Sequence, residues 1–320
     1  MSFTVLGTGS VLPKNVVTND DLSKFLDTSD EWIRTRTGIA TRHIMTDETV
    51  TQMAVDAANL ALENAGVGAN EIDYILCSTL GGDYISPALG SMVQVGIGAA
   101  CPACDMNAGC SGLLYALDLA AGIFAHRKIG KMLLIAAEGL TRLADWTDRS
   151  TCVLFGDGAG AMVLGATEEG GLSYVDLTSA GWADPLYIPF PQTNYGGREN
   201  KAVSYLKMDG QEVYKFAVNA ISTGIQKALD ATGLAPENVH HVLLHQANLR
   251  IIEAAKRKLP IPHDRYPTNI DHTGNMSAAT IPVLLDECNR AGMFKNGDNL
   301  ILCAFGAGLT SGTAVLRWGC

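Results

Sequence analysis

Apolar runs and helical spacing alternate along the first half of the chain. Residues 72–79 and 131–137 are continuous apolar runs, which are typical of strands buried in a parallel sheet. Residues 51–65 and 87–97 have the apolar spacing of helices, and a short strand is expected at 3–6. Because strands alternate with helices, the pattern predicts crossover connections and a mainly parallel sheet.

The second half repeats this order of elements without a repeat of residue identity. A loop rich in Pro, Gly and Tyr is expected at residues 182–200. The pattern predicts strands at 172–177, 239–244, 299–304 and 313–317, and helices at 213–229, 249–259 and 278–290. Two similar α/β halves are therefore expected, on either side of residues 165–171.

Residues 101–124 combine a short apolar lead-in, a glycine turn and a helix that is apolar on nearly every face. Cys110 falls where this helix begins, and its only charged residue is Asp118. The N–H groups and dipole at a helix start favour a thiolate, the form of cysteine that attacks. The alternative is an inert core cysteine, since free cysteines are often buried.

The stretch 27–38 is polar and rich in turn-forming residues, with Trp32 between acidic and basic side chains. It is interpreted as a solvated loop whose tryptophan covers part of the core. The alternative is an aromatic and basic platform for a nucleotide or a phosphate.

Composition narrows the class of protein. The chain has 320 residues, of which 47% are hydrophobic and 18% charged, so a large packed core is expected. The net charge of −10 argues against nucleic acid as the general partner. No signal peptide and no apolar run of membrane-spanning length are recognised, and the eight scattered cysteines suggest a reduced set. A cytoplasmic protein is expected.

Two polar sites follow strands in the second half. His245 stands where a buried strand ends, and Asn275 lies in a glycine-containing polar turn. Ligands of open α/β sheets bind at the carboxyl ends of strands. A sharp bend at 304–309 is placed to aim backbone N–H groups at an oxyanion.

Nucleotide and metal motifs are weaker. The glycines at 156–160 resemble a dinucleotide fingerprint but precede a strand-like run, and no P-loop occurs. His241 and His245 are four residues apart on a strand, about 13 Å, so they do not share a metal ion by themselves. Cys101 and Cys104 form a CxxC without a second pair, which leaves a redox disulfide as an alternative to core packing.

Six motifs together resemble the β-ketoacyl-ACP synthase III family. They are DEWIRTRTGI (30–39), AGCSG (108–112), DRSTCVLFGDGAGA (148–161), HQANLR (245–250), HTGNMSAAT (272–280) and AFGAGLTSG (304–312). The resemblance covers essentially the whole chain in order. It implies the thiolase-like fold, which consists of two related halves, here 1–168 and 169–320. Two mixed five-stranded sheets then lie between layers of helices in an α-β-α-β-α arrangement. The resemblance also implies a homodimer.

The resemblance also implies roles for single residues. The catalytic triad becomes Cys110, His245 and Asn275, with the N–H groups of Cys110 and Ala307 as the oxyanion hole. For coenzyme A, the implied contacts are Trp32 and Arg149 around the adenine, Arg36 and Lys215 near the phosphates, and Asn248. For the acyl carrier protein (ACP), they are Gln246, Ala247, Asn248, Leu249 and Arg250. Ser86 and Pro87 are implied at the acyl pocket.

The implied reaction joins an acyl-CoA primer, acetyl-CoA being the one expected, to malonyl-ACP and starts fatty acid synthesis. The acyl group is held on Cys110, and no metal or redox cofactor is required. Arg250, Lys256, Arg257 and Lys258 crowd one helix, which favours docking of an acidic carrier despite the net negative charge. An ordinary basic helix end is the alternative.

Three rival functions are considered. The order Cys-His-Asn also occurs in papain-like proteases, but their nucleophile lies near the N-terminus, and 109 residues precede Cys110 here. An acyltransferase or starter-unit synthase of a secondary pathway would share the fold. A non-enzymatic binding module is disfavoured because all three catalytic positions are filled.

Overall fold

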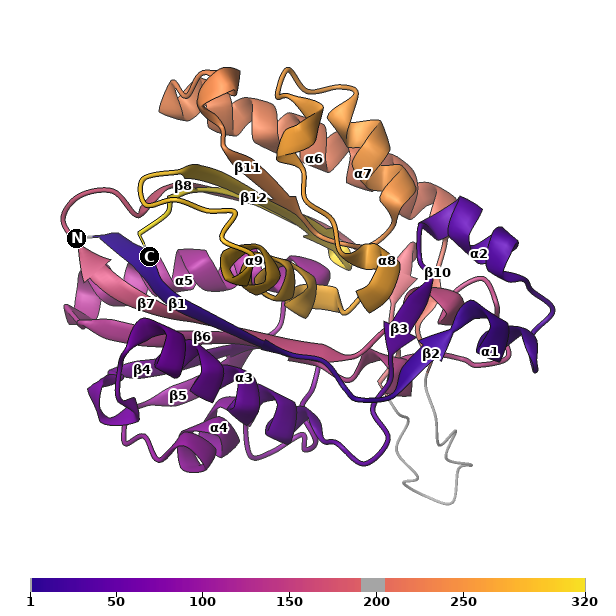
Figure 1. Cartoon of the computed structure of the whole chain (residues 1–320), viewed down its shortest axis with the longest axis horizontal. Helices are drawn as coiled ribbons and strands as arrows, with labels where there is room; N and C mark the ends of the chain where they lie inside the picture. The colour runs from indigo at the N-terminus through magenta and orange to yellow at the C-terminus, as the bar shows by residue number, and fades with distance from the viewer. Residues whose placement is uncertain (1, 191–204, 320) are drawn as a thin grey trace.

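Two mixed β-sheets form the frame of the protein (Figure 1). The computed structural model describes residues 2–190 and 205–319. The strands of the first sheet, in spatial order, are β1 (Ser2–Val11), β7 (Gly158–Thr167), β6 (Lys131–Glu138), β4 (Tyr74–Ser78) and β5 (Ala103–Met106). Those of the second are β11 (His241–Leu244), β12 (Asn299–Gly306), β13 (Gly308–Arg317) and β8 (Leu172–Trp182).

Helices lie on both faces of each sheet and give five layers (Figure 1). The long helices are α3 (Val50–Ala65), α4 (Leu89–Ile97), α5 (Gly112–Arg127), α6 (Gly210–Thr232), α7 (Leu249–Lys256) and α9 (Thr280–Arg290). The apolar faces of α3 and α4 cover the outside of the first sheet, and those of α6 and α7 cover the outside of the second. Because α5 and α9 contact both sheets, they form the central layer. The α-β-α-β-α order implied by the resemblance is confirmed.

Strand direction differs from the pattern-based expectation. Within the two sheets of the described residues, β4 pairs in parallel with β5 and β6, and β11 with β12, whereas β7 runs antiparallel to both of its neighbours. The prediction of a mainly parallel sheet is therefore wrong. The second sheet has four strands within 2–190 and 205–319, where the resemblance implies five.

The stretch 27–38 is interpreted from the sequence as a loop, but the structure has a helix there. Residues Asp30–Thr37 form helix α2, which begins after Ser29, whose side chain accepts the N–H of Trp32, and ends at Gly38 with a φ of 83°. Only Ile33 and Thr37 of this helix are buried, so the apolar stripe is too narrow to be seen in the sequence. Three short elements lie near it: β2 (Val16–Thr18), α1 (Asn19–Ser23) and β3 (Thr41–His43).

Three further short elements are β9 (Leu186–Tyr187), β10 (Lys207–Met208) and α8 (Ile270–Thr273). The predicted loop at 182–200 falls partly outside the described residues, from 191 onward. Among the described helices, Gly109–Arg127 is long and apolar enough to cross a membrane. Its side chains Leu113, Leu117 and Phe124 are buried between the two sheets, which makes it a core helix.

Candidate active site

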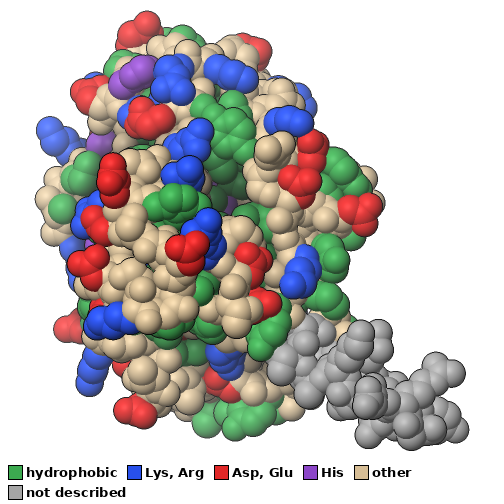
Figure 2. Space-filling model, turned by 90° about the vertical axis from the view of Figure 1, so that its right-hand side faces the viewer, with side chains coloured by type: hydrophobic (Ala, Val, Ile, Leu, Met, Phe, Trp, Pro, Cys, Tyr) green, Lys and Arg blue, Asp and Glu red, His purple; other side chains and the backbone are tan. Residues whose placement is uncertain are grey.

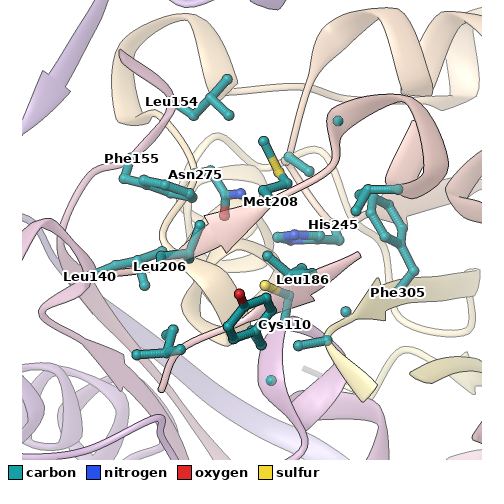
Figure 3. Close-up of a pocket in the computed structure, with 18 of the residues that line it drawn as sticks. Cys110, Leu140, Leu154, Phe155, Leu186, Leu206, Met208, His245, Asn275 and Phe305 are labelled. Atoms are coloured by element: carbon teal, nitrogen blue, oxygen red, sulfur yellow. The ribbon is translucent and has the colours of Figure 1, made fainter. Parts of the chain in front are cut away.

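One pocket of about 1120 Å³ contains Cys110, His245 and Asn275. Figure 3 shows their side chains pointing into a common space. Each residue comes from a different part of the fold: Cys110 precedes α5, His245 follows β11, and Asn275 follows α8. The walls are largely apolar and come from Leu140, Leu154, Phe155, Leu186, Leu206, Met208 and Phe305.

Backbone close to Cys110 is shaped by two glycines. Gly109 has a φ of 56°, and a Cβ there would lie 3.3 Å from the Ala307 nitrogen. A Cβ on Gly306 would lie 2.7 Å from the Cys110 nitrogen, so the end of β12 approaches the turn closely. Thr310 donates to the Ala307 carbonyl at 2.8 Å and lies 2.7 Å from the Ser111 hydroxyl. These contacts hold the backbone of Ala307 beside that of Cys110.

Cys110 holds a neutral thiol in the free protein. Burial raises the pKa of this thiol to about 11, and the nearby Glu138 charge adds to the rise. Loss of water acts against the thiolate, whereas the N–H groups at a helix start act in its favour. The expected thiolate is not the resting form of Cys110.

His245 is also neutral. The residue is 1% exposed, and its ring packs edge-on against Phe305 with 5.2 Å between centroids. Burial lowers the pKa of the imidazole to about 3. Its Nδ1 lies 2.6 Å from the Thr280 hydroxyl, and its backbone N–H donates to Cys303 at 2.9 Å. The ring is thus fixed in position and uncharged at neutral pH.

Asn275 is held by backbone on both sides. Its N–H donates to the Leu154 carbonyl at 2.8 Å, and its own carbonyl accepts the Gly156 N–H at 3.0 Å. The side-chain Oδ1 accepts the Ser277 N–H at 2.8 Å. Because the oxygen is occupied, the amide NH₂ is the group left to donate into the pocket.

Glu138 is a buried carboxyl beside the site that the sequence did not single out. It ends β6, is 1% exposed, and accepts the Leu80 N–H at 3.1 Å. Burial raises the pKa of this carboxyl to about 8, although the hydrogen bond from the Leu80 N–H lowers it. Glu138 is therefore mostly protonated at pH 7.

Glu138→Gln should flatten the pH dependence of stability. The folded-state pKa is above the unfolded value, so the native chain binds the extra proton and stability falls as pH rises from about 4.5 to about 8. Urea unfolding at several pH values should show a smaller decline for the variant, by a few kcal/mol at most at ~1.4 kcal/mol per pKa unit. The exposed Glu63→Gln is the control, and an unchanged slope in Glu138→Gln would contradict the assignment.

Trp32 and Arg36 lie at the mouth of the pocket on one face of α2. The guanidinium carbon of Arg36 lies 4.6 Å from the Trp32 ring centroid, and that of Arg149 lies 5.3 Å from it. Arg149 also pairs with Asp27 at 3.1 Å. In Figure 2, apolar side chains gather around a hollow on this face, with Lys and Arg side chains at its rim. Trp32, Arg36 and Arg149 therefore form one aromatic and basic cluster, and its use as a platform for a nucleotide or a phosphate stays a prediction.

Of the other residues predicted to contact coenzyme A or the carrier protein, some line the pocket and others lie outside it. Asn248 lines the pocket and caps α7 by accepting the Arg250 N–H at 2.9 Å, and Arg250 is exposed at the rim. Lys215 lies outside the pocket lining and pairs with Glu212 at 2.7 Å. Ala247 lines the pocket, and Leu249 is half-buried.

Gln246 does not face a carrier protein. Its side chain is buried, donates to the Leu244 carbonyl at 2.7 Å and accepts the Asn269 N–H at 3.3 Å. Because both the nitrogen and the oxygen of this buried amide are hydrogen-bonded, the side chain stabilises the turn after β11. Its side chain is therefore not available as a docking contact.

Ser86 and Pro87 are exposed and stand outside the lining of the pocket in this chain. Their assignment to the acyl pocket stays a prediction. Cys101 and Cys104 are both free thiols, and the sulfur of Cys104 lies 3.5 Å from the Tyr74 hydroxyl.

One pocket is lined by a cysteine thiol and by two neutral side chains that can donate N–H groups, an arrangement that fits a condensing acyltransferase. Residues 104–181 and 229–318 match the family profiles of 3-oxoacyl-[acyl-carrier-protein] synthase III and of its C-terminal part. The chain belongs to the β-ketoacyl-ACP synthase III family.

Named relatives agree over the full length. The chain is 44% identical to β-ketoacyl-ACP synthase III of Xanthomonas campestris pv. campestris, with 98% of both chains covered. It is 39% identical to that of Clostridium acetobutylicum, with 99% of both covered.

Solved structures give the same result. The enzyme from Aquifex aeolicus is similar with a TM-score of 0.93 and 41% identity, covering 99% of this chain and all of the other. The priming β-ketosynthase of the R1128 polyketide pathway is similar with a TM-score of 0.93 and 33% identity, covering 99% and 96%.

Proposed function

We propose that the protein condenses an acyl-CoA primer, acetyl-CoA first, with malonyl-ACP through an acyl-Cys110 intermediate. The observation that carries the proposal is the convergence of Cys110, His245 and Asn275 in one pocket. The family's enzymes act on ACP-linked substrates by name, which supports the second substrate.

The first step exchanges one thioester for another. The Cys110 sulfur attacks the acyl-CoA carbonyl carbon, the bond to the coenzyme A sulfur breaks, and the thiol proton leaves with coenzyme A. The N–H groups of Cys110 and Ala307 stabilise the oxyanion, which is worth ~3–4 kcal/mol per donor. The close approach of Gly306 to Cys110 supports this hole.

The second step uses the two neutral donors. Malonyl-ACP loses CO₂ while His245 and Asn275 donate to its thioester oxygen, where negative charge develops. The resulting carbanion attacks the acyl-Cys110 carbonyl, and the Cys110 sulfur leaves and takes a proton from water. This route needs no metal or redox cofactor.

Trp32→Ala should raise the KM for acetyl-CoA about 10-fold, because one lost aromatic contact is worth ~1–1.5 kcal/mol. Trp32 would stack on the adenine after Arg149 moves away from the ring, with Arg36 turned to the phosphates. Initial-rate kinetics check this, with the exposed Trp182→Ala as the control. An unchanged KM would place the nucleotide elsewhere.

Carrier docking is assigned to the rim near α7. Arg250 is exposed there, and Arg257 lies with it beside a smaller cavity of about 260 Å³. An acidic carrier would be attracted to these charges although the chain carries −10 overall. A cytoplasmic homodimer is part of the proposal, supported by the family and by the position of β5 at the edge of the first sheet.

A starter-unit synthase of a secondary pathway is the second candidate. The similarity to the priming β-ketosynthase of the R1128 polyketide pathway supports this second candidate. The two differ in their primer, so the acyl group accepted by the chain decides between them.

The overall reaction is tested with purified chain, acetyl-CoA and malonyl-ACP. Mass spectrometry of the carrier should show acetoacetyl-ACP together with release of CO₂. Decarboxylation without a condensed product, or no reaction with either substrate, would overturn the proposal.

A further inference from the structure

Thr280 contacts the catalytic histidine from behind the pocket. It is the first residue of α9, is fully buried, and is absent from the pocket lining. Its Oγ1 lies 2.6 Å from His245 Nδ1 and 3.0 Å from the Ser277 carbonyl, and the Gln246 N–H approaches it at 3.4 Å. One hydroxyl thus meets a ring nitrogen, an acceptor and a donor.

The proton of this hydroxyl has two possible destinations. The Ser277 carbonyl already accepts the backbone N–H of Thr280, so it does not depend on the hydroxyl. The Gln246 N–H occupies a lone pair of Oγ1. Donation to His245 Nδ1 therefore satisfies every group around Thr280 and gives the buried ring nitrogen a donor.

The state of the ring decides what this contact does. Burial lowers the pKa of His245, so the imidazole is neutral and carries a single N–H. A nitrogen that accepts a hydrogen bond carries no hydrogen, and the other nitrogen then does. Nδ1 is turned to Thr280, whereas the ring itself lines the pocket (Figure 3).

We propose that the Thr280 hydroxyl donates to Nδ1 of His245 and holds the ring in the tautomer whose Nε2–H faces the pocket. Thr280 is thus a positioning residue that acts through His245. The inference rests on the proposed function, in which that N–H donates to the malonyl thioester oxygen. Without it, the ring would present a lone pair to an oxygen that is gaining negative charge.

Thr280→Val keeps the shape of the side chain and removes the hydroxyl. We expect malonyl-ACP decarboxylation to fall on the order of 10- to 100-fold, by analogy with the loss when the hydrogen-bond partner of a metal-binding histidine is removed. Acyl-Cys110 formation should fall much less, because that step does not need the Nε2–H. Thr280→Ser should restore decarboxylation, which simple loss of packing would not predict.

The tautomer itself is measured by ¹⁵N NMR of ring-labelled histidine in the wild-type chain at pH 7. His245 is assigned by the signal lost in His245→Asn. We expect hydrogen on Nε2 and none on Nδ1, and a ring with hydrogen on Nδ1 would overturn the inference. Equal loss of both half-reactions in Thr280→Val and Thr280→Ser would also overturn it.

The outcomes separate the two proposals. If the wild-type chain forms no β-ketoacyl product, the proposed function fails, and the NMR spectrum still reports the tautomer. If the product forms but the ring carries hydrogen on Nδ1, the role of Thr280 alone fails.

Discussion

Cys110→Ser abolishes formation of the acyl-enzyme, with a loss of more than about 10³-fold in the acylation rate. A serine hydroxyl in the same place is a weaker nucleophile than a thiol, and no base within the proposed first step activates it. The neutral thiol of Cys110, with its pKa raised to about 11, makes the polarisable sulfur the essential feature. Intact-mass spectrometry after incubation with acetyl-CoA measures the adduct.

Cys104→Ser is the matched control for this change. Cys104 is a partly exposed free thiol on β5, away from the pocket lining. Its variant should gain the acetyl mass as the wild type does. An acetyl adduct on the Cys110→Ser variant at the wild-type rate would assign the nucleophile to another residue.

His245→Ala and Asn275→Ala should keep acylation and lose decarboxylation of malonyl-ACP. Each removes one N–H donor from the thioester oxygen, a loss of about 10²–10³-fold for a single donor. Neither residue is needed to form acyl-Cys110 in the proposed first step. Two separate assays measure the effect: the acetyl mass on the enzyme, and CO₂ released from malonyl-ACP.

His126→Ala, an exposed residue in the last turn of α5, is the control for both assays. It should behave as the wild type in each. Loss of acylation alone in His245→Ala or Asn275→Ala, with decarboxylation retained, would reverse the assignment of these residues to the second step.

The sequence was a good guide to the buried elements and a poor one to strand direction. The apolar run of β6 and the helical spacing of α3 gave their elements to within a residue or two. Antiparallel pairing of β7 with β6 was missed, because burial on both faces produces the same apolar run in either direction. Helix α2 was missed because it buries only Ile33 and Thr37.

The sequence allowed the residues of the site to be predicted, but not their protonation states. Cys110, His245 and Asn275 stood in recognisable motifs, and they line one pocket. The neutral thiol was not predictable, because desolvation depends on walls formed by distant segments.

Neighbours of the site were harder to interpret. Thr280 was already part of HTGNMSAAT, but its contact with His245 depends on how α9 meets the end of β11. Gln246 looked like a surface residue of HQANLR, yet its side chain is buried. Glu138 ended an apolar run and carried no signal of its environment.

The central claim is that Cys110 carries the acyl group to malonyl-ACP. The most direct test weighs the intact enzyme after incubation with a panel of acyl-CoAs, and again after malonyl-ACP is added. We expect a single acyl adduct that maps to Cys110, is largest for the accepted primer, and disappears with malonyl-ACP as β-ketoacyl-ACP forms. No adduct from any acyl-CoA, or an adduct that malonyl-ACP leaves in place, would contradict this account.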